Sequence, residues 1–127
     1  MNDDGFELIY SYSRKQAIED GVLVDVSEQA RASGFKIPVC VGDNLYHGYV
    51  VPPEGMEGEG QSLEGRLHDL LEMTKNAARN SSESDRVYFE VLFLTSPGHL
   101  EKVRCVAVVG PGDKLEPVMT ICLPMDL

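Results

Sequence analysis

The chain has 127 residues, 43% of them hydrophobic and 25% charged, a composition typical of one globular domain with its own core. Its net charge of −10 is opposite in sign to that of proteins that grip nucleic-acid phosphates, so no direct nucleic-acid binding is expected. No apolar run approaches the roughly 20 residues of a membrane span. The acidic first residues lack a signal-peptide pattern, and we therefore expect a cytoplasmic protein that does not bind membranes.

The N-terminal half is expected to be mainly helical, after a loose end at residues 1–6. Ser13 and Gly21 enclose the sequence RKQAIED in the way that an N-cap and a left-handed C-cap enclose a short helix. A second short helix, EQARA, follows an extended piece at residues 22–26. That piece, or residues 7–10, can add a short strand to the edge of a sheet.

The middle of the chain joins a polar loop to the longest helix. Residues 52–61, PPEGMEGEGQ, combine two prolines, three glycines and three glutamates with little to bury, which predicts a mobile acidic loop. Ser62 is a suitable N-cap for a helix at about residues 62–80, where leucines recur at spacings of three and four and form one apolar stripe.

Three segments of the C-terminal third have the period-two alternation of half-buried strands: about 86–95, 102–109 and 117–123. The connections between them, SPGHLE and GPGDKLE, are short and rich in Pro and Gly, which favours antiparallel hairpins. In the second connection Asp113 is expected to bond the backbone of its own turn. The predicted fold is therefore α+β: a single domain, 1–127, whose helical N-terminal half packs on a three-stranded antiparallel β-meander.

The apolar stripe of the long helix can cover one face of this sheet, but both faces carry apolar residues. The second face holds Leu92, Leu94, Val106 and Val108. Either the short N-terminal helices cover this face, or it forms an exposed patch on which a partner docks.

No arrangement of side chains predicts catalysis, a cofactor or a metal ion. The cysteines are odd in number and form no CxxC pair, so buried reduced thiols are expected at Cys40, Cys105 and Cys122. His68 and Glu72 lie one helical turn apart, but a zinc site needs three or four ligands and no third ligand is evident.

The strongest feature outside the core is a run of acids between Asp43 and Met73, where seven carboxylates accompany a single base, Arg66, for a local net charge of −6. Such a surface attracts a basic partner and speeds encounter with it, although a solvated acidic surface has the same composition. Nearby tyrosines suit an interface or a half-buried rim. The candidate interaction surface consists of Asp43, Tyr46, Tyr49, Glu54, Glu57, Glu59, Glu64, Asp69 and Glu72.

Three stretches carry a family resemblance: LIYSYSRKQAIEDGVLVDVSEQARASGFKIPV (8–39), GRLHDLLEM (65–73) and VVGPGDKLEPVMTICLPMD (108–126). They are similar to a family of small uncharacterised proteins encoded by bacteria, often on plasmids and other mobile elements. The signatures YSY–DGVLVDVSE and GPGD–EPV–T–LP are the most specific part of the match. The resemblance implies no known activity. Many members carry Trp at the positions of Tyr46 and His68, which argues against a family-wide catalytic or metal-binding role for His68.

These observations lead to one main hypothesis and two alternatives. The main hypothesis is a non-enzymatic accessory protein that binds another protein through the acidic surface, its carboxylates standing in for nucleic-acid phosphates toward a basic host enzyme. The first alternative is a small enzyme or ligand-binding domain with a helix–sheet pocket, in which Asp25 and His68 are the candidate acid–base groups. The second is a homodimeric structural protein that pairs through the second face of the sheet.

Overall fold

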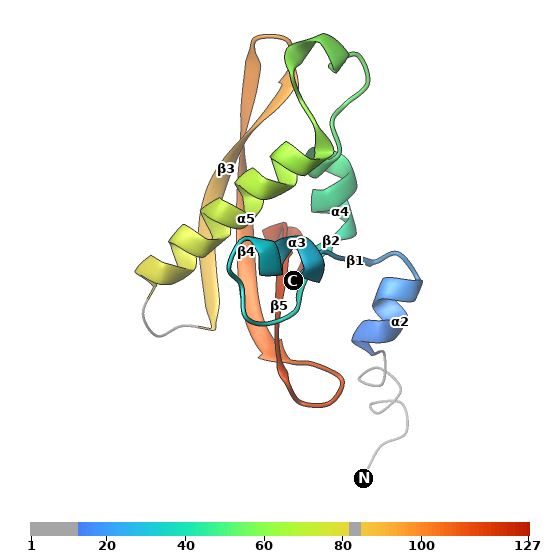
Figure 1. The fold of residues 1–127 in the computed structure, drawn as a ribbon, viewed down its shortest axis with the longest axis vertical. Coiled ribbons are helices and arrows are strands. Elements are labelled where there is room, and N and C mark those ends of the chain that lie inside the picture. The colour runs from blue at the N-terminus through green and yellow to red at the C-terminus, as the bar shows by residue number, and fades with distance from the viewer. Residues whose placement is uncertain (1–12, 82–84) are drawn as a thin grey trace.

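A computed structural model describes residues 13–81 and 85–127 as an α+β fold built on one five-stranded sheet with the strand order β1-β2-β5-β4-β3 (Figure 1). The strands are β1 (Leu23–Asp25), β2 (Val39–Gly42), β3 (Arg86–Ser96), β4 (His99–Pro111) and β5 (Pro117–Cys122). The α-helices are α2 (Arg14–Glu19), α3 (Ser27–Ala32), α4 (Asp43–Leu45) and α5 (Leu63–Asn80). A π-helical turn (Tyr46–Val50) follows α4, and 3-10 turns span Glu57–Glu59 and Pro124–Asp126.

The sheet is mixed, so the predicted three-stranded antiparallel meander is wrong. β3, β4 and β5 do run antiparallel to one another, but β2 lies parallel to β5, with Val41 opposite Ile121, and β1 pairs antiparallel with β2. All four residues of β2, VCVG, are buried. A short strand that is buried on both faces shows no alternation, so its sequence pattern does not separate it from other apolar runs. The N-terminal half therefore supplies two strands as well as helices.

Local signals mark the first described elements correctly. Ser13 caps α2, because its side chain accepts a hydrogen bond from the backbone N–H of Gln16 at 2.9 Å. Gly21 follows the helix with a φ of +80°, a left-handed conformation that costs glycine little. The edge strand expected within residues 22–26 is present as β1, whereas residues 7–10 lie outside the described residues.

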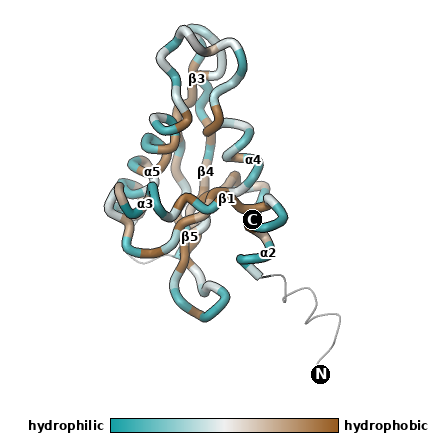
Figure 2. Tube along the Cα trace, turned by 45° about the vertical axis from the view of Figure 1, so that its right-hand side comes forward, coloured by the Kyte–Doolittle hydropathy of each residue, from teal (hydrophilic) through white to brown (hydrophobic). Residues whose placement is uncertain are grey.

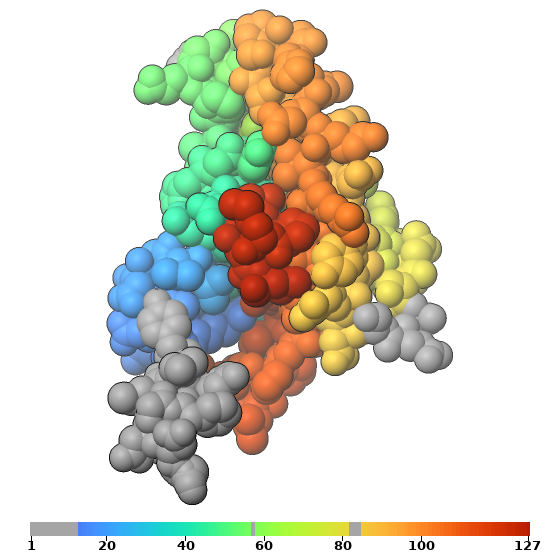
Figure 3. All heavy atoms as spheres, turned by 180° about the vertical axis from the view of Figure 1, so that it is seen from behind, coloured from blue at the N-terminus to red at the C-terminus, as the bar shows by residue number. Residues whose placement is uncertain are grey.

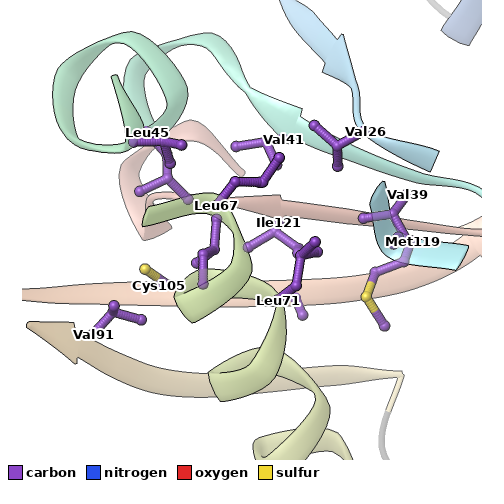
Figure 4. Close-up of a cluster of buried hydrophobic side chains, with 14 of the residues drawn as sticks. Val26, Val39, Val41, Leu45, Leu67, Leu71, Val91, Cys105, Met119 and Ile121 are labelled. Carbon is purple, nitrogen blue, oxygen red and sulfur yellow. The ribbon is translucent and has the colours of Figure 1, made fainter. Parts of the chain in front are cut away.

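Helix α5 covers one face of the sheet (Figure 4). Ser62 caps it by accepting from the N–H of Gly65 at 3.0 Å, and the helix has the predicted span. Its side chains Leu67 and Leu71 point at the sheet, where Ile121 of β5 lies in the same buried cluster. Full burial of one such side chain stabilises a fold by about 1.5–3 kcal/mol. Because the buried cluster between α5 and the sheet contains many such side chains, this face forms the main core.

The three cysteines lie in the interior, as expected from their apolar neighbours. Cys40, Cys105 and Cys122 are all buried and free. Burial takes a thiolate out of water, and it raises the pKa of each thiol, to about 12 at Cys105. Apolar residues follow the strands and the inner side of α5 in Figure 2, whereas the loops at the top of the molecule are mostly hydrophilic. Within the described residues, no helix combines the length and the apolar composition that crossing a bilayer requires.

The second face of the sheet is only partly covered (Figure 3). α2 lies against it, because the Arg14 guanidinium donates to Thr120 Oγ1 at 2.8 Å and to the carbonyl of Met119. The segment after β5 also folds back over this face, where Val106 is fully buried. Leu92, near the β3 end of the same face, stays 59% exposed. Among the described residues, α2 and the segment after β5 therefore cover the middle of this face, and Leu92 at its β3 end remains exposed.

The turn between β4 and β5 fastens α2 to the sheet. Both carboxylate oxygens of Asp113 accept backbone N–H groups of α2, from Arg14 at 2.8 Å and from Lys15 at 3.0 Å. These backbone hydrogen bonds hold the pKa of Asp113 below its usual value. The expectation that Asp113 bonds its own turn is wrong; Glu116 does so, accepting from the N–H of Lys114 at 2.9 Å. A turn pattern alone cannot reveal a partner that lies 99 residues away.

Candidate functional site

The loop of the acidic segment lies at one end of the molecule, beside the turn between β3 and β4 (Figures 1 and 2). It contains a 3-10 turn at Glu57–Glu59, and Gly60 ends that turn in a left-handed conformation. Met56 is only 2% exposed, so the loop has one apolar anchor that its composition does not suggest. Mobility of the rest of the loop stays a prediction.

The structure exposes most of the predicted acidic surface but distributes it over several elements. Asp69 and Glu72 lie on one side of α5, and the half-buried Glu72 pairs with Lys75 at 3.1 Å. Asp43, at the start of α4, pairs with His47 Nδ1 at 2.6 Å. The side chain of Glu57 lies outside the described part of the chain. The exposed acids of the segment are Asp43, Glu54, Glu59, Glu64 and Asp69.

The only base of this segment, Arg66, points inward. It is 4% exposed, and every hydrogen-bond partner that the structure gives it is an uncharged oxygen. Its guanidinium also lies over the Phe93 ring, 5.3 Å from the ring centroid. Its guanidinium donates to the carbonyls of Tyr49 and Val50 at the end of the π-helical turn, to that of Leu94 on β3, and to Gln61 Oε1. Burial lowers the pKa of Arg66, which nevertheless remains charged in proteins. This side chain therefore ties the acidic loop, α5 and β3 together, and its charge is not displayed beside the acids.

The two predicted interface tyrosines lie half-buried against the core. The ring of Tyr49 lies 5.7 Å from that of Phe93, and its hydroxyl donates to Glu101 Oε2 at 3.2 Å. That hydrogen bond to a carboxylate is the main cause that raises the pKa of Tyr49. Tyr46 packs against the core and meets the His47 ring edge-on, with 5.0 Å between the ring centroids. Both tyrosines therefore have structural contacts, and only part of each ring is open to a partner.

No metal centre is formed by the described residues. His68 is exposed on α5, and Glu72, its neighbour one turn on, pairs with Lys75 instead. Across residues 13–81 and 85–127, no group of three His, Cys, Asp or Glu side chains is placed to hold a metal ion.

The aspartate considered for acid–base work, Asp25, lines a cavity of about 360 Å³ between α2 and the sheet. Its carboxylate accepts the backbone N–H of Ser27 at 2.9 Å. Arg14 and Asp113 line the same cavity, and both are engaged in holding α2. His68 is not among the lining residues, so the structure does not bring the two candidate acid–base groups together.

A second hollow lies between α5 and β3 and reaches about 460 Å³. Asp69, Glu72 and Met73 contribute from α5, and Glu90 and Leu92 from β3. Val91 and Lys102 complete the lining. Met73 and Leu92 are 41% and 59% exposed, so acids and open apolar side chains meet here. We call this hollow the α5–β3 groove.

The sequence of residues 1–127 matches a family of unknown function, DUF6573, over its whole length. The chain belongs to that family. No curated protein and no solved structure matches it. The resemblance to an uncharacterised family is thereby confirmed, and membership transfers no activity to any residue described above.

Sequence reasoning did not reveal that the strand side of the groove lies beside the acids of α5. The sequence places Leu92 on a second apolar face, because it alternates with the buried Val91 and Phe93, and leaves open whether the N-terminal helices or a partner covers that face. The exposure of Leu92 follows from the position of β3 at the end of the sheet, and strand order is not written in the pattern of one strand. Glu90 lies between apolar neighbours in the sequence. A single charge within an apolar strand is typical of an edge strand, so this residue could have indicated that β3 lies at the edge of the sheet.

Proposed function

We propose that this chain is a non-enzymatic accessory protein that works by binding another protein through its acidic surface. One observation carries the proposal: Arg66, the only base between Asp43 and Met73, is buried against uncharged oxygens, so the exposed charge of the segment is almost entirely negative. A surface of one sign steers a partner of the opposite sign and raises its association rate. The partner is therefore a protein with a basic surface.

The charge of the partner suggests its class. Proteins that handle DNA or RNA display basic grooves for phosphates, and carboxylates held on a loop and a helix face can occupy such a groove. The resemblance to small proteins of bacterial plasmids and other mobile elements supports a host enzyme as the target, met in the bacterial cytoplasm. In this proposal Glu54, Glu57 and Glu59 on the loop, together with Glu64 and Asp69 on α5, stand in for phosphates.

The alternative of a small enzyme has less support. The cavity beside Asp25 is the candidate pocket for it, but the charged groups that line this cavity make structural hydrogen bonds. Arg14 bonds Thr120, Asp113 bonds the N–H groups of α2, and Asp25 bonds Ser27. Groups held in this way are poorly placed to exchange protons with a substrate.

The experiment that tests the proposal is capture of partners from a bacterial lysate by the immobilised chain, followed by elution with duplex DNA. The test variant replaces Glu54, Glu57 and Glu59 by Gln. The matched control changes the net charge equally at acids elsewhere: Glu19 and Glu28 to Gln, and Asp85 to Asn. We expect nucleic-acid-binding proteins that the loop variant loses, that the control variant keeps and that DNA displaces.

Equal loss from both variants would mean that bulk charge, rather than the acidic segment, is responsible. Equal retention by both would remove the acidic loop as a recognition surface. Partners that stay bound in the presence of excess DNA would contradict phosphate mimicry while leaving protein binding in place.

A further inference from the structure

Within residues 13–81 and 85–127, no strand pairs with the backbone groups on the outer side of β3. β3 pairs with β4 in a register that sets Arg86 opposite Val108, and the carbonyl of Asp85 accepts the N–H of Val109 at 2.8 Å. In an antiparallel ladder, residues that bond the partner directly alternate with residues whose N–H and C=O point away from it. Because Asp85 bonds β4, the odd-numbered residues of β3 do so, and Tyr88, Glu90 and Leu92 direct their backbone groups outward.

The bonding on the far side of β4 agrees with this assignment. Gly112 N–H donates to the carbonyl of Glu116 at 2.6 Å, and the β4–β5 register sets Val106 opposite Cys122. Even-numbered residues of β4 therefore bond β5, which leaves the odd-numbered ones for β3. Within residues 13–81 and 85–127, no strand lies on the outer side of β3, since the sheet order ends there.

This edge has few of the devices that usually protect an exposed strand. Natural edge strands are short, or carry proline, lysine or inward-pointing charges. β3 spans 11 residues, RVYFEVLFLTS, without proline or lysine, and its central stretch has one charge, Glu90. Its register with β4 shifts only at Leu94 and Ser96, near the end of the strand. The outward groups of Tyr88, Glu90 and Leu92 thus form a regular template about three alternate residues long.

The α5–β3 groove lies along this template. Glu90, Val91 and Leu92 of β3 form one wall, and Asp69, Glu72 and Met73 of α5 form the other. A strand added to β3 would continue the sheet at the usual spacing of about 4.8 Å and would run beside α5. Its alternate side chains would contact Met73 on one face and Leu92 on the other, which are 41% and 59% exposed.

The charges around the groove favour a basic segment as the bound strand. Asp69, Glu72 and Glu90 are acidic, Lys102 is the only base in the lining, and Lys75 already pairs with Glu72. A strand that carries Lys or Arg among apolar residues fits this lining, whereas a second copy of β3 would bring another Glu90 into a molecule of net charge −10.

We propose that β3 binds an extended segment of a partner protein by strand addition, with basic and apolar side chains of that segment alternating along the α5–β3 groove. This inference rests on the proposed function, because it names the mode in which the basic partner is held. Backbone hydrogen bonds to the outward groups supply affinity, and the acids and exposed apolar side chains supply specificity.

The first test needs no ligand. Hydrogen exchange of the full chain is followed by NMR, residue by residue along β3. We expect slow exchange for Val87, Phe89 and Val91 and fast exchange for Tyr88, Glu90 and Leu92. Equal protection of both sets would show that the outer edge is already occupied and would overturn the proposal.

The second test uses random twelve-residue peptides displayed on phage and selected on the immobilised full chain. We expect selected sequences to alternate apolar residues with Lys or Arg. The best peptide is then synthesised in two N-methylated forms, each methylated on one set of alternate residues. Strand addition predicts that one form loses affinity by about tenfold or more, because it loses several hydrogen bonds to the outward groups of β3, while the other form binds normally. Equal binding of the two forms, or failure to select any peptide, would overturn strand addition.

Leu92→Arg and Leu100→Arg form a matched pair for the groove. The two leucines are on the same hairpin and are 59% and 57% exposed, but only Leu92 lines the groove. We expect Leu92→Arg to weaken peptide binding at least tenfold and to slow partner capture, and Leu100→Arg to change neither. Equal binding by both variants would place the peptide elsewhere.

These outcomes separate the inference from the proposed function. Partners lost by the Glu54, Glu57 and Glu59 variant but kept by Leu92→Arg would leave acidic recognition in place and overturn strand addition. A concentration-dependent dimer in sedimentation experiments, abolished by Leu92→Arg alone, would identify a second copy as the occupant and would also overturn it.

Discussion

At one edge of the sheet lies β1, three residues long, with α2 packed beside it; at the other lies β3, 11 residues long, with no described strand on its outer side. α2 is fixed by the carboxylate of Asp113, which accepts a backbone N–H of the helix, and by the side chain of Arg14, which donates to Thr120 on β5. At the open edge, α5 and β3 instead leave a groove between them. A short, covered edge resists pairing with other chains, whereas a long apolar edge invites it. We therefore place the proposed recognition site at the β3 edge, where no described strand lies on the outer side.

The largest loss of stability is expected for Arg66→Met, because Arg66 joins the acidic loop, α5 and β3 beside the open edge. Arg66 satisfies the carbonyls of Tyr49, Val50 and Leu94 in a buried position, and its loss leaves them without a donor. Each unsatisfied buried group costs about 1–3 kcal/mol, so the free energy of unfolding should fall by about 3 kcal/mol. Arg79→Met, on the exposed side of the same helix, should change it by less than about 0.5 kcal/mol. Urea denaturation checks both, and equal losses would refute the role given to Arg66.

A smaller loss is expected from Gly42→Ala, on the side of the sheet that supports the covered edge. Gly42 lies opposite Leu23 of β1, and an added Cβ would meet the Cβ of Cys122 at 3.0 Å. Overpacking of this kind costs about 1–3 kcal/mol. At Gly48 an added Cβ meets nothing within 4 Å, so Gly48→Ala should be neutral or stabilising by about 0.5 kcal/mol. Thermal unfolding distinguishes the two, and similar melting temperatures would contradict the close approach.

Asp113→Ala should expose the part of the second face that α2 covers, without unfolding the protein. The variant removes the acceptor for the N–H groups of Arg14 and Lys15, so α2 should lift more often from the sheet. Cys40, buried next to this cavity, should then react faster with a thiol reagent, while Cys105 stays protected. Glu19→Gln, an exposed acid of α2, is the control. Unchanged labelling of Cys40 would show that other contacts hold the helix.

The same contact predicts a dependence on pH. The pKa of Asp113 is lowered in the folded state, so its contribution to stability is present above the pKa of the unfolded chain, about 3.9. That contribution is lost as the pH falls from there through the lowered pKa of the folded state. The amide signals of Arg14 and Lys15 should titrate in this acidic range in the native protein and should lose that titration in Asp113→Asn. Signals that move alike in both proteins would argue against the contact.

The smallest effect is expected at the open edge itself. Leu92 is 59% exposed, so Leu92→Thr should change the free energy of unfolding by less than about 0.5 kcal/mol. Its neighbour Val91 is 2% exposed, and Val91→Thr buries a hydroxyl at a cost of about 1–3 kcal/mol. Urea denaturation of the two variants compares the two faces of β3. A large loss of unfolding free energy in Leu92→Thr would mean that the side chain of Leu92 is packed in solution and that the groove is closed.

Local chemistry explains what the sequence predicts correctly. Ser62 and the leucine spacing define α5, Ser13 and Gly21 bracket α2, and the alternation in β3 and β4 defines a hairpin. Each of these signals lies within one element or between neighbours in the chain. The burial of Cys105 also follows from its apolar neighbours.

The features that the sequence does not reveal are all long-range. β2 is identified by its parallel pairing with β5, and its four buried residues have no period of their own. Asp113 finds its partners in α2, far along the chain. The candidate groove depends on β3 being the last strand of the sheet, and an edge strand and a central strand can share one pattern. The residues Leu92 and Met73 therefore gain their meaning only from the strand order.

The parallel pairing of β2 with β5 also has a consequence for biosynthesis. β1 and β2 are synthesised early, but they join the rest of the sheet through the pairing of β2 with β5. α2 is likewise bound by the turn that precedes β5. Because chains grow at about 5–20 residues per second, the N-terminal third must wait several seconds for its template. During that interval the β3–β4 hairpin can form from neighbouring residues, with Val39 and Val41 still exposed. A nascent chain of this protein should thus be a substrate for chaperones until β5 is complete.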